Sequence, residues 1–283
     1  MNAKEAPWRE LMAEATARVR SKVSELVLGG EGTKVLGIGA SGDKTLVADQ
    51  KAEGELFRAL SEIRGLGFLS EEAGRRGDSK LSHLAIIDPL DGSSNFERGI
   101  PFYCSSVAIA KGKRLEDITH AFIRDLVTGD AFYAERGRGA TKNGVKLRTS
   151  KTMVLSSAVV GIDISMAEHG MLRRIEPLIR GAKRQVHYGA NALELCYLAD
   201  GRIDASIDLR KRMRITDFAA GFLIAKEAGA TITGDGQAGL RPAFDLRDRF
   251  SYFATANPTL HRRVLQLCVG GRAALRRTAS AAG

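Results

Sequence analysis

The sequence predicts an α/β (α+β) protein in which layers of helix and sheet are stacked. In residues 1–150, short apolar runs between turn residues predict a mainly antiparallel sheet, and two amphipathic patterns predict flanking helices. In residues 151–283, helix-like and strand-like segments alternate. Because each apolar face must be buried against another element, we expect an N-terminal α+β half and a C-terminal α/β half in stacked layers.

Helices flank the first half. From Trp8 to about Leu28, apolar residues recur every three or four positions, which predicts a helix that Gly29 and Gly30 end. The glycine-rich stretch GIGASGDK that follows predicts a loop. A second helix is expected from about Val47 to Arg64.

Strands are predicted where apolar runs end at acidic residues or turn signals. Phe68 and Leu69 predict a short strand, and HLAIID predicts a stronger strand that ends at Asp88. Further strand-like runs lie in CSSVAIAKGK, ITHAFIRDLVTGDAFYAER and GATKNGVKLRTS, where Asn143-Gly144 is a hairpin signal.

The second half opens with a strand in SSAVVGIDIS and closes with a strand in YFATAN and a helix from about Pro258 to Leu267. The small, basic tail from about residue 271 is expected to be mobile. The elements expected between them are a helix at 166–181, strands near Arg184 and at Ala205–Leu209, and a helix from about Thr216 to Ala228.

Composition narrows the class of protein. The 283 residues are 44% hydrophobic, enough for a sizeable core. We expect no membrane span, because no apolar run reaches about 18 residues, and no secretory signal, because charges are spread through the N-terminus. Three distant cysteines (Cys104, Cys196 and Cys268) predict buried thiols and a reducing cytoplasm. The five scattered histidines argue against a zinc site.

The formal net charge of +10 allows two interpretations, nucleic-acid binding or the capture of small anionic substrates. The basic residues are dispersed without interleaved aromatic residues, and no nucleic-acid-binding signature is evident. We therefore do not expect nucleic acid as the main partner. A solvated basic surface accounts for most of these charges.

The stretch LAIIDPLDGSSNF carries two aspartates at the end of an apolar strand. Asp88 ends the strand, so its carboxylate is expected to be partly buried, and a buried carboxylate normally needs a cation. Gly92, Ser93 and Ser94 then offer backbone N–H groups and hydroxyls that suit a phosphate. A plain turn is the alternative, because Asp, Pro and Gly are turn residues.

Two further acidic sites lie at predicted element ends. Glu71 and Glu72 follow the strand in GFLSEE, and Asp217 precedes the apolar helix in TDFAAG. A solvated turn or a helix N-cap explains each site alone. Taken together with Asp88, the three sites favour Mg²⁺, which binds carboxylates, waters and substrate phosphate, and paired Mg²⁺ ions promote phosphoryl displacement.

These motifs resemble those of the inositol monophosphatase superfamily of Mg²⁺-dependent sugar phosphatases. DPLDGSSNF is similar to its DP(I/L)DG(T/S)xN(F/Y) motif, SEE lies upstream where the family has GEE, and TDFAAG is similar to WDxAAG. The resemblance covers roughly residues 8–270. GASGDKTLVADQKAE, RDLVTGDAFYAERGRGA, LRKRMRITD and AFDLRDRF resemble the archaeal-type dual-activity inositol monophosphatase/fructose-1,6-bisphosphatase branch.

The resemblance implies a layered α-β-α-β-α sandwich of the sugar phosphatase type, a homodimer, and two or three bound Mg²⁺ ions, for which Mn²⁺ can substitute. The metal ligands that it implies are Glu71, Asp88, Asp91, Asp217 and the Leu90 carbonyl.

It also implies residues for catalysis and for substrate binding. The Ser93 hydroxyl would orient the attacking water, Asp49 would accept the proton of that hydroxyl or bind a further metal, and Glu71 would share in catalysis as a ligand. The amides of Gly92, Ser93 and Ser94 would hold the phosphate. The other substrate contacts expected are Asp91, Gly189, Asn191, Arg210, Lys211 and Arg212.

The chain departs from the family pattern in two informative places. Thr216 replaces the Trp of WDxAAG, and Arg210 stands where inositol-selective enzymes carry a Glu that binds a substrate hydroxyl. Both changes point toward the dual-activity branch. GANA at 189–192 and Val186 also differ from the usual residues and leave the sugar contacts open.

The basic string at 210–214 is a candidate site for a second phosphate. In an extended segment, Arg210, Arg212 and Arg214 would share one face and Lys211 the other. Guanidinium groups match phosphate oxygens bidentately. A solvated or dimer-facing basic strand is the alternative.

The sequence therefore predicts a cytoplasmic metal-dependent phosphoric monoester hydrolase that acts on a small phosphorylated sugar or cyclitol. The expected substrate is fructose 1,6-bisphosphate at its 1-phosphate, with inositol 1-phosphate as a second or side substrate. The alternatives are an inositol-phosphate-specific or nucleotide 3′-phosphatase of the same superfamily and, from another class, a non-catalytic nucleic-acid-binding or regulatory protein.

Overall fold

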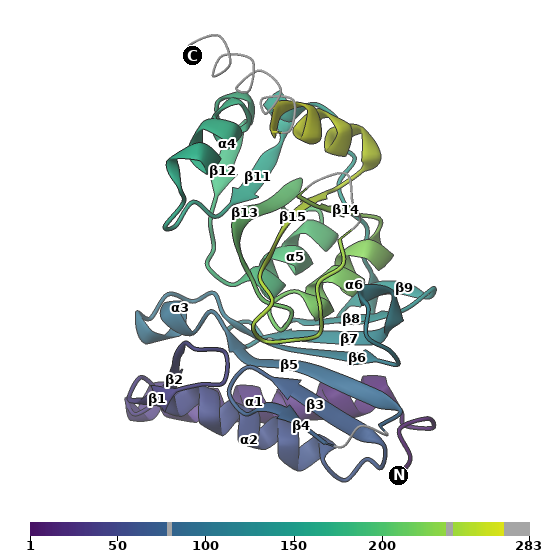
Figure 1. Cartoon of the computed structure of the whole chain (residues 1–283). Coiled ribbons are helices and arrows are strands. Elements are labelled where there is room, and N and C mark those ends of the chain that lie inside the picture. Colours follow the sequence, from purple (N-terminus) through teal and green to yellow (C-terminus); the bar gives the residue numbers. More distant parts are fainter. Residues whose placement is uncertain (78–80, 236–239, 269–283) are drawn as a thin grey trace.

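The computed structural model describes residues 1–77, 81–235 and 240–268, and its helices and sheets form stacked layers in the order α-β-α-β-α (Figure 1). This order confirms the layered α/β architecture expected from the sequence. The expected mobile tail from about residue 271 lies outside the described residues.

The first layer consists of helices α1 (Trp8–Gly29) and α2 (Val47–Leu60), which pack against each other and against the large sheet. The apolar face predicted for α1 is buried at Trp8, Met12 and Val19. Gly30 ends α1 in the left-handed region, as the sequence predicts. The sequence placed the end of α2 at Arg64, but the helix ends at Leu60, because turn and bend residues then lead to the next strand.

The large sheet has eight strands in the order β10-β9-β8-β7-β6-β5-β3-β4. Its pairs are antiparallel except for the parallel pair β3/β5, which confirms the mainly antiparallel sheet expected for the first half. The strands are β3 (Leu66–Ser70), β4 (Gly74–Arg76), β5 (His83–Asp91), β6 (Cys104–Ala110), β7 (Ile118–Asp125), β8 (Ala131–Glu135), β9 (Gly139–Lys142) and β10 (Val145–Lys146).

The middle layer consists of helices α5 (Asn191–Ala199) and α6 (Ala219–Ala228). The largest group of buried apolar residues joins both helices to the large sheet and the small sheet. The sequence placed the start of α6 at Thr216, but residues 216–218 form a turn and the helix begins at Ala219.

The small sheet has five strands in the order β12-β11-β13-β15-β14, with parallel pairs at β11 and antiparallel pairs at β15. Helix α4 (His169–Gly181) and the helical residues 258–268 cover its outer face and form the fifth layer (Figure 1). The strands are β11 (Val159–Ile162), β12 (Arg184–Val186), β13 (Ala205–Met213), β14 (Thr231–Gly234) and β15 (Phe250–Thr255).

Several elements were not predicted. The loop expected in GIGASGDK is present at residues 39–43, but it joins two strands that were not predicted, β1 (Val35–Ile38) and β2 (Lys44–Leu46). Strand β1 was missed because all its residues are exposed and no alternation appears. Helix α5 was missed because it is buried on nearly all sides, which removes the amphipathic period. Strand β14, the short helix α3 (Ser93–Glu97) and the 3₁₀ turns Leu115–Asp117 and Leu155–Ser157 were also not predicted.

The three cysteines are free and buried, as the sequence predicts. Within the described ranges, no helix is both long enough and apolar enough to cross a membrane.

Candidate active site

Three carboxylates from distant parts of the sequence meet in the interior. Glu71 follows β3, Asp88 lies in β5 and Asp217 lies in the turn before α6. One carboxylate oxygen from each residue lies within 4.8 Å of the others, and all three side chains are buried. The structure thus brings together three of the sequence-predicted metal ligands. Such a set of hard oxygen donors suits a divalent cation such as Mg²⁺.

Asp88 has the least compensated charge of the three. Its Oδ1 accepts a hydrogen bond from the Leu90 N–H at 3.0 Å, but its buried Oδ2 has no hydrogen-bond partner within the described ranges. Burial, followed by the nearby charges of Glu71 and Asp91, raises the pKa of Asp88 well above its ordinary value. A buried carboxylate oxygen without a partner, beside two other carboxylates, fits a divalent cation.

The ionised form of Glu71 is also disfavoured by burial. Burial raises its pKa to about 8, and the charges of Asp217 and Glu72 act in the same direction, while Arg214 opposes them. A bound cation would favour the ionised form of each carboxylate, so these residues fit a metal ion.

Arg214 supplies a positive charge to the cluster. Its Nε donates to Asp217 Oδ2 at 2.9 Å, and its Nη1 pairs with Asp43 Oδ2 at 2.6 Å and contacts Glu71 Oε1. The sequence placed Arg214 in the basic string without linking it to the carboxylates. No sequence signal gives this pairing, because it joins residues 143 positions apart.

Asp91 lies at the end of β5, where the first turn of α5 meets it. The Ala192 N–H donates to Asp91 Oδ2 at 2.7 Å, and the Cys104 thiol lies 3.7 Å from the same oxygen. Burial, followed by the charge of Asp217, raises the pKa of Asp91 to about 7. Asp91 is therefore electrostatically linked to the three-carboxylate cluster, although it is not among its mutually close members.

Gly92 makes a sharp turn after Asp91. Its φ is 92°, and a Cβ at this position would lie 2.9 Å from the Phe102 carbonyl oxygen, so only glycine fits. Ser93 is partly buried and Ser94 is exposed at the start of α3. The turn thus places the hydroxyls and amides of the predicted phosphate-binding segment directly beside the aspartates.

Asn95 holds this segment against the second half of the chain. Its Nδ2 donates to the carbonyls of Phe102 and Tyr188, each at 2.7 Å. A Cβ on Gly189 would lie 3.2 Å from the Asn95 amide, and Gly189 itself has a φ of 78°. The predicted substrate residue Gly189 therefore lies beside this segment. Asn191 begins α5, whose first turn contacts Asp91 through the Ala192 N–H. Asn95 was not singled out in the sequence, although the family motif contains it.

Asp49 lies in the first turn of α2 and is buried. Its Oδ2 accepts a hydrogen bond from the Leu46 N–H at 2.6 Å, and burial raises its pKa to about 7. No hydrogen bond joins Asp49 to Ser93 within the described ranges. Glu72 accepts a hydrogen bond from the Thr45 hydroxyl of β2, so the unpredicted hairpin contacts the acidic region.

The basic string does not alternate as expected. Lys211 has a φ of 58°, and the pairing of β13 with β15 is irregular between Asp208 and Met213, so the regular two-face pattern was wrong. Arg210 donates through Nη2 to Asp208 at 2.6 Å and pairs with Asp163 at 2.5 Å. Lys211 and Arg212 are exposed.

The comparisons with known proteins agree with this geometry. The family model described as "Inositol monophosphatase family" matches residues 8–269. A fructose-1,6-bisphosphatase/inositol-1-monophosphatase of Methanothermobacter thermautotrophicus is 32% identical, over 92% of this chain and 95% of the relative. A fructose-1,6-bisphosphatase of Pyrococcus furiosus is 34% identical, over 92% of this chain and 97% of the relative.

A solved structure is also similar. A Pyrococcus horikoshii protein, described as hypothetical with similarities to inositol-1 monophosphatase, is 30% identical and has a TM-score of 0.80. The match covers 92% of this chain and 97% of that one. With the motifs, the five-layer order and the buried carboxylates in agreement, the chain belongs to the inositol monophosphatase family and is a phosphatase.

Proposed function

We propose that this protein is a Mg²⁺-dependent phosphatase that hydrolyses fructose 1,6-bisphosphate at the 1-phosphate, with inositol 1-phosphate as a second substrate. The observation that carries the metal dependence is the orphaned Oδ2 of Asp88, buried beside Glu71 and Asp217. A catalytically inactive binding protein would not need three buried carboxylates, in which burial and the charge of Asp217 raise the pKa of both Glu71 and Asp88.

The residues that would hold Mg²⁺ are Glu71, Asp88, Asp91, Asp217 and the Leu90 carbonyl. When bound, Mg²⁺ would lower the pKa of water and neutralise charge on the phosphoryl oxygens. The chain itself provides a buried site of carboxylates. The Arg214 guanidinium pairs with Glu71 and Asp217. When Mg²⁺ binds, Arg214 must either keep these carboxylates as shared partners or move away from them.

Ser93 and Asp49 are the residues that we assign to proton handling. The Ser93 hydroxyl would orient the attacking water, and Asp49 would accept the proton of that hydroxyl. Asp49 Oδ2 is held by the Leu46 N–H, which fixes the side chain. A pKa of about 7, raised by burial, suits a group that exchanges a proton near neutral pH.

The substrate phosphate would bind the amides of Gly92, Ser93 and Ser94, which directly follow the acidic residues. The segment Arg210–Arg212 would bind the remote phosphate of a bisphosphate. Gly189 and Asn191 would contact the sugar, because both lie where α5 meets the phosphate segment.

A phosphate-release assay tests the proposal. Fructose 1,6-bisphosphate, inositol 1-phosphate and adenosine 3′,5′-bisphosphate are compared with Mg²⁺ and with EDTA, with Asp88→Asn as the inactive control. We expect Mg²⁺-dependent release from the first two substrates and a higher kcat/KM for fructose 1,6-bisphosphate. Release that persists in EDTA would contradict the metal dependence, and preference for the adenosine compound would favour the nucleotide phosphatase alternative.

One observation favours selectivity for inositol phosphate instead. The Arg210 guanidinium is shared between Asp163 and Asp208, so less of its charge is available for a second phosphate. In that case inositol 1-phosphate would show the higher kcat/KM in the same assay. The homodimer also remains a prediction, which sedimentation of the purified protein would test.

A further inference from the structure

A cavity of about 480 Å³ lies at the opposite end of β5 from the acidic cluster. His83 begins β5 and Asp88 lies five residues later, which separates the two sites by about 16 Å of extended strand. The cavity is lined by Arg75, Gly77, Leu81, Ser82, His83, Leu84, Ala110, Lys111, Gly112 and Lys113. Nothing in the proposed catalytic machinery uses these residues.

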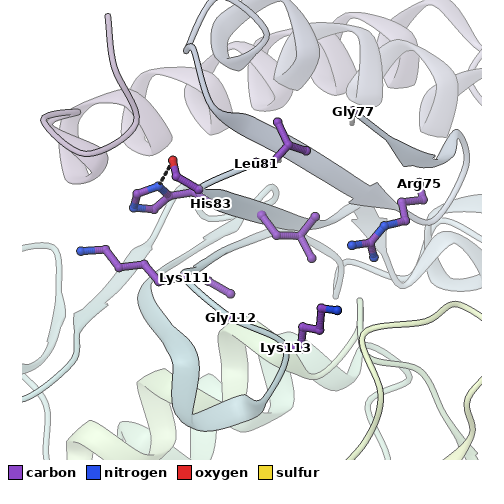
Figure 2. A pocket seen from close by; sticks show the side chains of 10 residues that line it. Arg75, Gly77, Leu81, His83, Lys111, Gly112 and Lys113 are labelled. Atoms are coloured by element: carbon purple, nitrogen blue, oxygen red, sulfur yellow. Dashed lines mark hydrogen bonds between the residues drawn. The ribbon is translucent and has the colours of Figure 1, made fainter. Parts of the chain in front are cut away.

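Among the described residues that line the cavity, the charged ones are all basic. Figure 2 shows the Lys111 ammonium and the His83 ring at one end of the cavity and Arg75 with Lys113 at the other. None of the three cations, Arg75, Lys111 and Lys113, forms an ion pair within residues 1–77, 81–235 and 240–268. To the described part of the chain, Arg75 donates one side-chain hydrogen bond, a long contact of 3.3 Å to the Phe244 carbonyl.

Asp117, which lies beside Gly112 of the cavity, already has hydrogen-bond partners. Asp117 Oδ2 accepts hydrogen bonds from the N–H groups of Lys113 and Arg114, each at 3.0 Å, and pairs with the Arg114 guanidinium. Asp117 therefore closes the turn that carries Lys113, and among the described residues the Lys113 ammonium forms no ion pair.

His83 also lines the cavity, and its ring lies 5.8 Å from the Trp8 ring of α1. The side chain is only 4% exposed, and its Nδ1 lies 2.9 Å from the Ser82 hydroxyl. Its buried Nε2 has no hydrogen-bond partner within the described ranges.

We propose that this cavity binds a small anion that carries at least two negative charges, such as a phosphate monoester or a polycarboxylate. A guanidinium and two ammonium groups around one cavity match the oxygens of such an anion. Leu81 and Leu84 offer apolar surface to the uncharged part of the ligand. The volume falls within the range of small-molecule sites.

Isothermal titration calorimetry on EDTA-treated protein at physiological salt tests the site, with inorganic phosphate and citrate as probes. Removing divalent metal keeps the catalytic site from binding the probes through metal, so the result does not depend on the proposed function. We expect a dissociation constant of about 1 mM or lower for at least one probe. Phosphate binding identifies a phosphate ester as the ligand class, and citrate binding identifies a polycarboxylate.

The double variant Lys111→Glu/Lys113→Glu should bind the probe at least about tenfold more weakly, because two attractive contacts become repulsive. The matched control is Arg173→Glu/Lys183→Glu, which makes the same change in net charge at exposed positions in and after α4. It should keep the wild-type affinity. Thermal unfolding verifies that both variants are folded, and Lys111→Gln/Lys113→Gln replaces the first variant if it is not.

Three results would overturn the proposal. They are no heat of binding for either probe with wild-type protein, an unchanged affinity in the cavity variant, and an equal loss in the control variant. The last result would mean that the overall charge of the protein, and not this cavity, attracts the anion.

Discussion

Arg214 Nε donates a hydrogen bond to Asp217 Oδ2 at 2.9 Å, so one of the proposed metal ligands in the acidic cluster already has a cationic partner. Asp88, in the same cluster, has a buried oxygen without any partner in the described part of the chain. The burial of the two aspartates therefore costs the metal-free protein different amounts of free energy. We nevertheless propose both as ligands of the same Mg²⁺ ion or of two neighbouring Mg²⁺ ions.

This difference predicts opposite effects of two isosteric substitutions on stability. Asp88→Asn should raise the unfolding free energy of the metal-free protein by about 1–3 kcal/mol, because it removes a buried, uncompensated charge. Asp217→Asn should lower the unfolding free energy, because Arg214 loses a partner. Both variants should lose phosphatase activity. Urea unfolding in EDTA and the phosphate-release assay measure the two properties.

Near-normal activity in either variant would contradict the metal assignment. Equal changes in stability would contradict the difference between the two aspartates while leaving the assignment intact. The exposed Glu176 on α4 provides the control, because Glu176→Gln should change neither property.

The contacts of Arg214 predict how the melting temperature responds to Mg²⁺. Arg214→Gln should destabilise the metal-free protein by about 2–4 kcal/mol, since it leaves Glu71 and Asp217 without their cation. Mg²⁺ should then raise the melting temperature of the variant more than that of the wild type, because the ion restores the missing positive charge. Differential scanning calorimetry with EDTA and with saturating Mg²⁺ measures both shifts.

The control for Arg214 is Arg58→Gln, which removes an exposed arginine that pairs with Glu55 on the same helix. It should leave the Mg²⁺ response unchanged, because exposed pairs contribute little. An equal response to Mg²⁺ in wild type and Arg214→Gln would show that the guanidinium does not occupy the charge environment of the metal.

The sequence was sufficient to predict the site residues that lie next to apolar strands or helices. Glu71 and Asp88 could be placed because each follows or ends a strand whose apolar pattern is strong. Asp217 could be placed because an apolar helix follows it. These signals are local, and the short motif around each residue carries them.

What the sequence did not predict depends on tertiary contacts. Arg214 looked like one member of a basic string, and only the fold brings it to Glu71. An extended segment would place Arg210 and Arg212 on one face, but the left-handed conformation of Lys211 breaks this alternation. Helix α5 has no polar face, because it is buried between two sheets, so periodicity could not reveal the helix whose first turn binds Asp91.

Glu194 predicts a pH dependence of stability that is separate from the metal ligands. It is buried on α5, accepts a hydrogen bond from the Ser206 hydroxyl at 2.8 Å, and burial raises its pKa to about 7 from an ordinary value of 4.5. Below pH 4.5 the group is protonated in both states and costs nothing. As pH rises from 4.5 to 7, only the unfolded state releases the proton, so stability falls, by about 3 kcal/mol in total.

Glu194→Gln should remove this contribution. The variant and the wild type should have similar unfolding free energies near pH 4.5, and the variant should be the more stable protein at pH 8. Because other buried carboxylates also titrate, the quantity to compare is the difference between the two proteins at each pH, measured by urea unfolding. A constant difference across this range would show that the pKa of Glu194 is the same in the folded and unfolded states.

The last prediction concerns which arginine of β13 binds a remote phosphate. Arg210 donates to Asp208 and pairs with Asp163, whereas Arg212 is exposed and forms no ion pair within the described ranges. Arg212→Gln should therefore lower kcat/KM for fructose 1,6-bisphosphate at least about tenfold, since a charge-assisted hydrogen bond contributes about 1.5–3 kcal/mol. Its effect on inositol 1-phosphate should stay within about twofold, because that substrate has no second phosphate.

Arg210→Gln is the informative comparison, because it leaves Asp163 and Asp208 without their shared cation. It should lower stability and reduce kcat/KM for both substrates alike. A selective loss for the bisphosphate in Arg210→Gln, but not in Arg212→Gln, would assign the remote phosphate to Arg210, as the sequence alone suggested. Equal losses for both substrates in Arg212→Gln would mean that this residue supports the turn before Asp217. If neither variant loses activity toward the bisphosphate, the segment does not contact the second phosphate, and the preference for fructose 1,6-bisphosphate loses its structural basis.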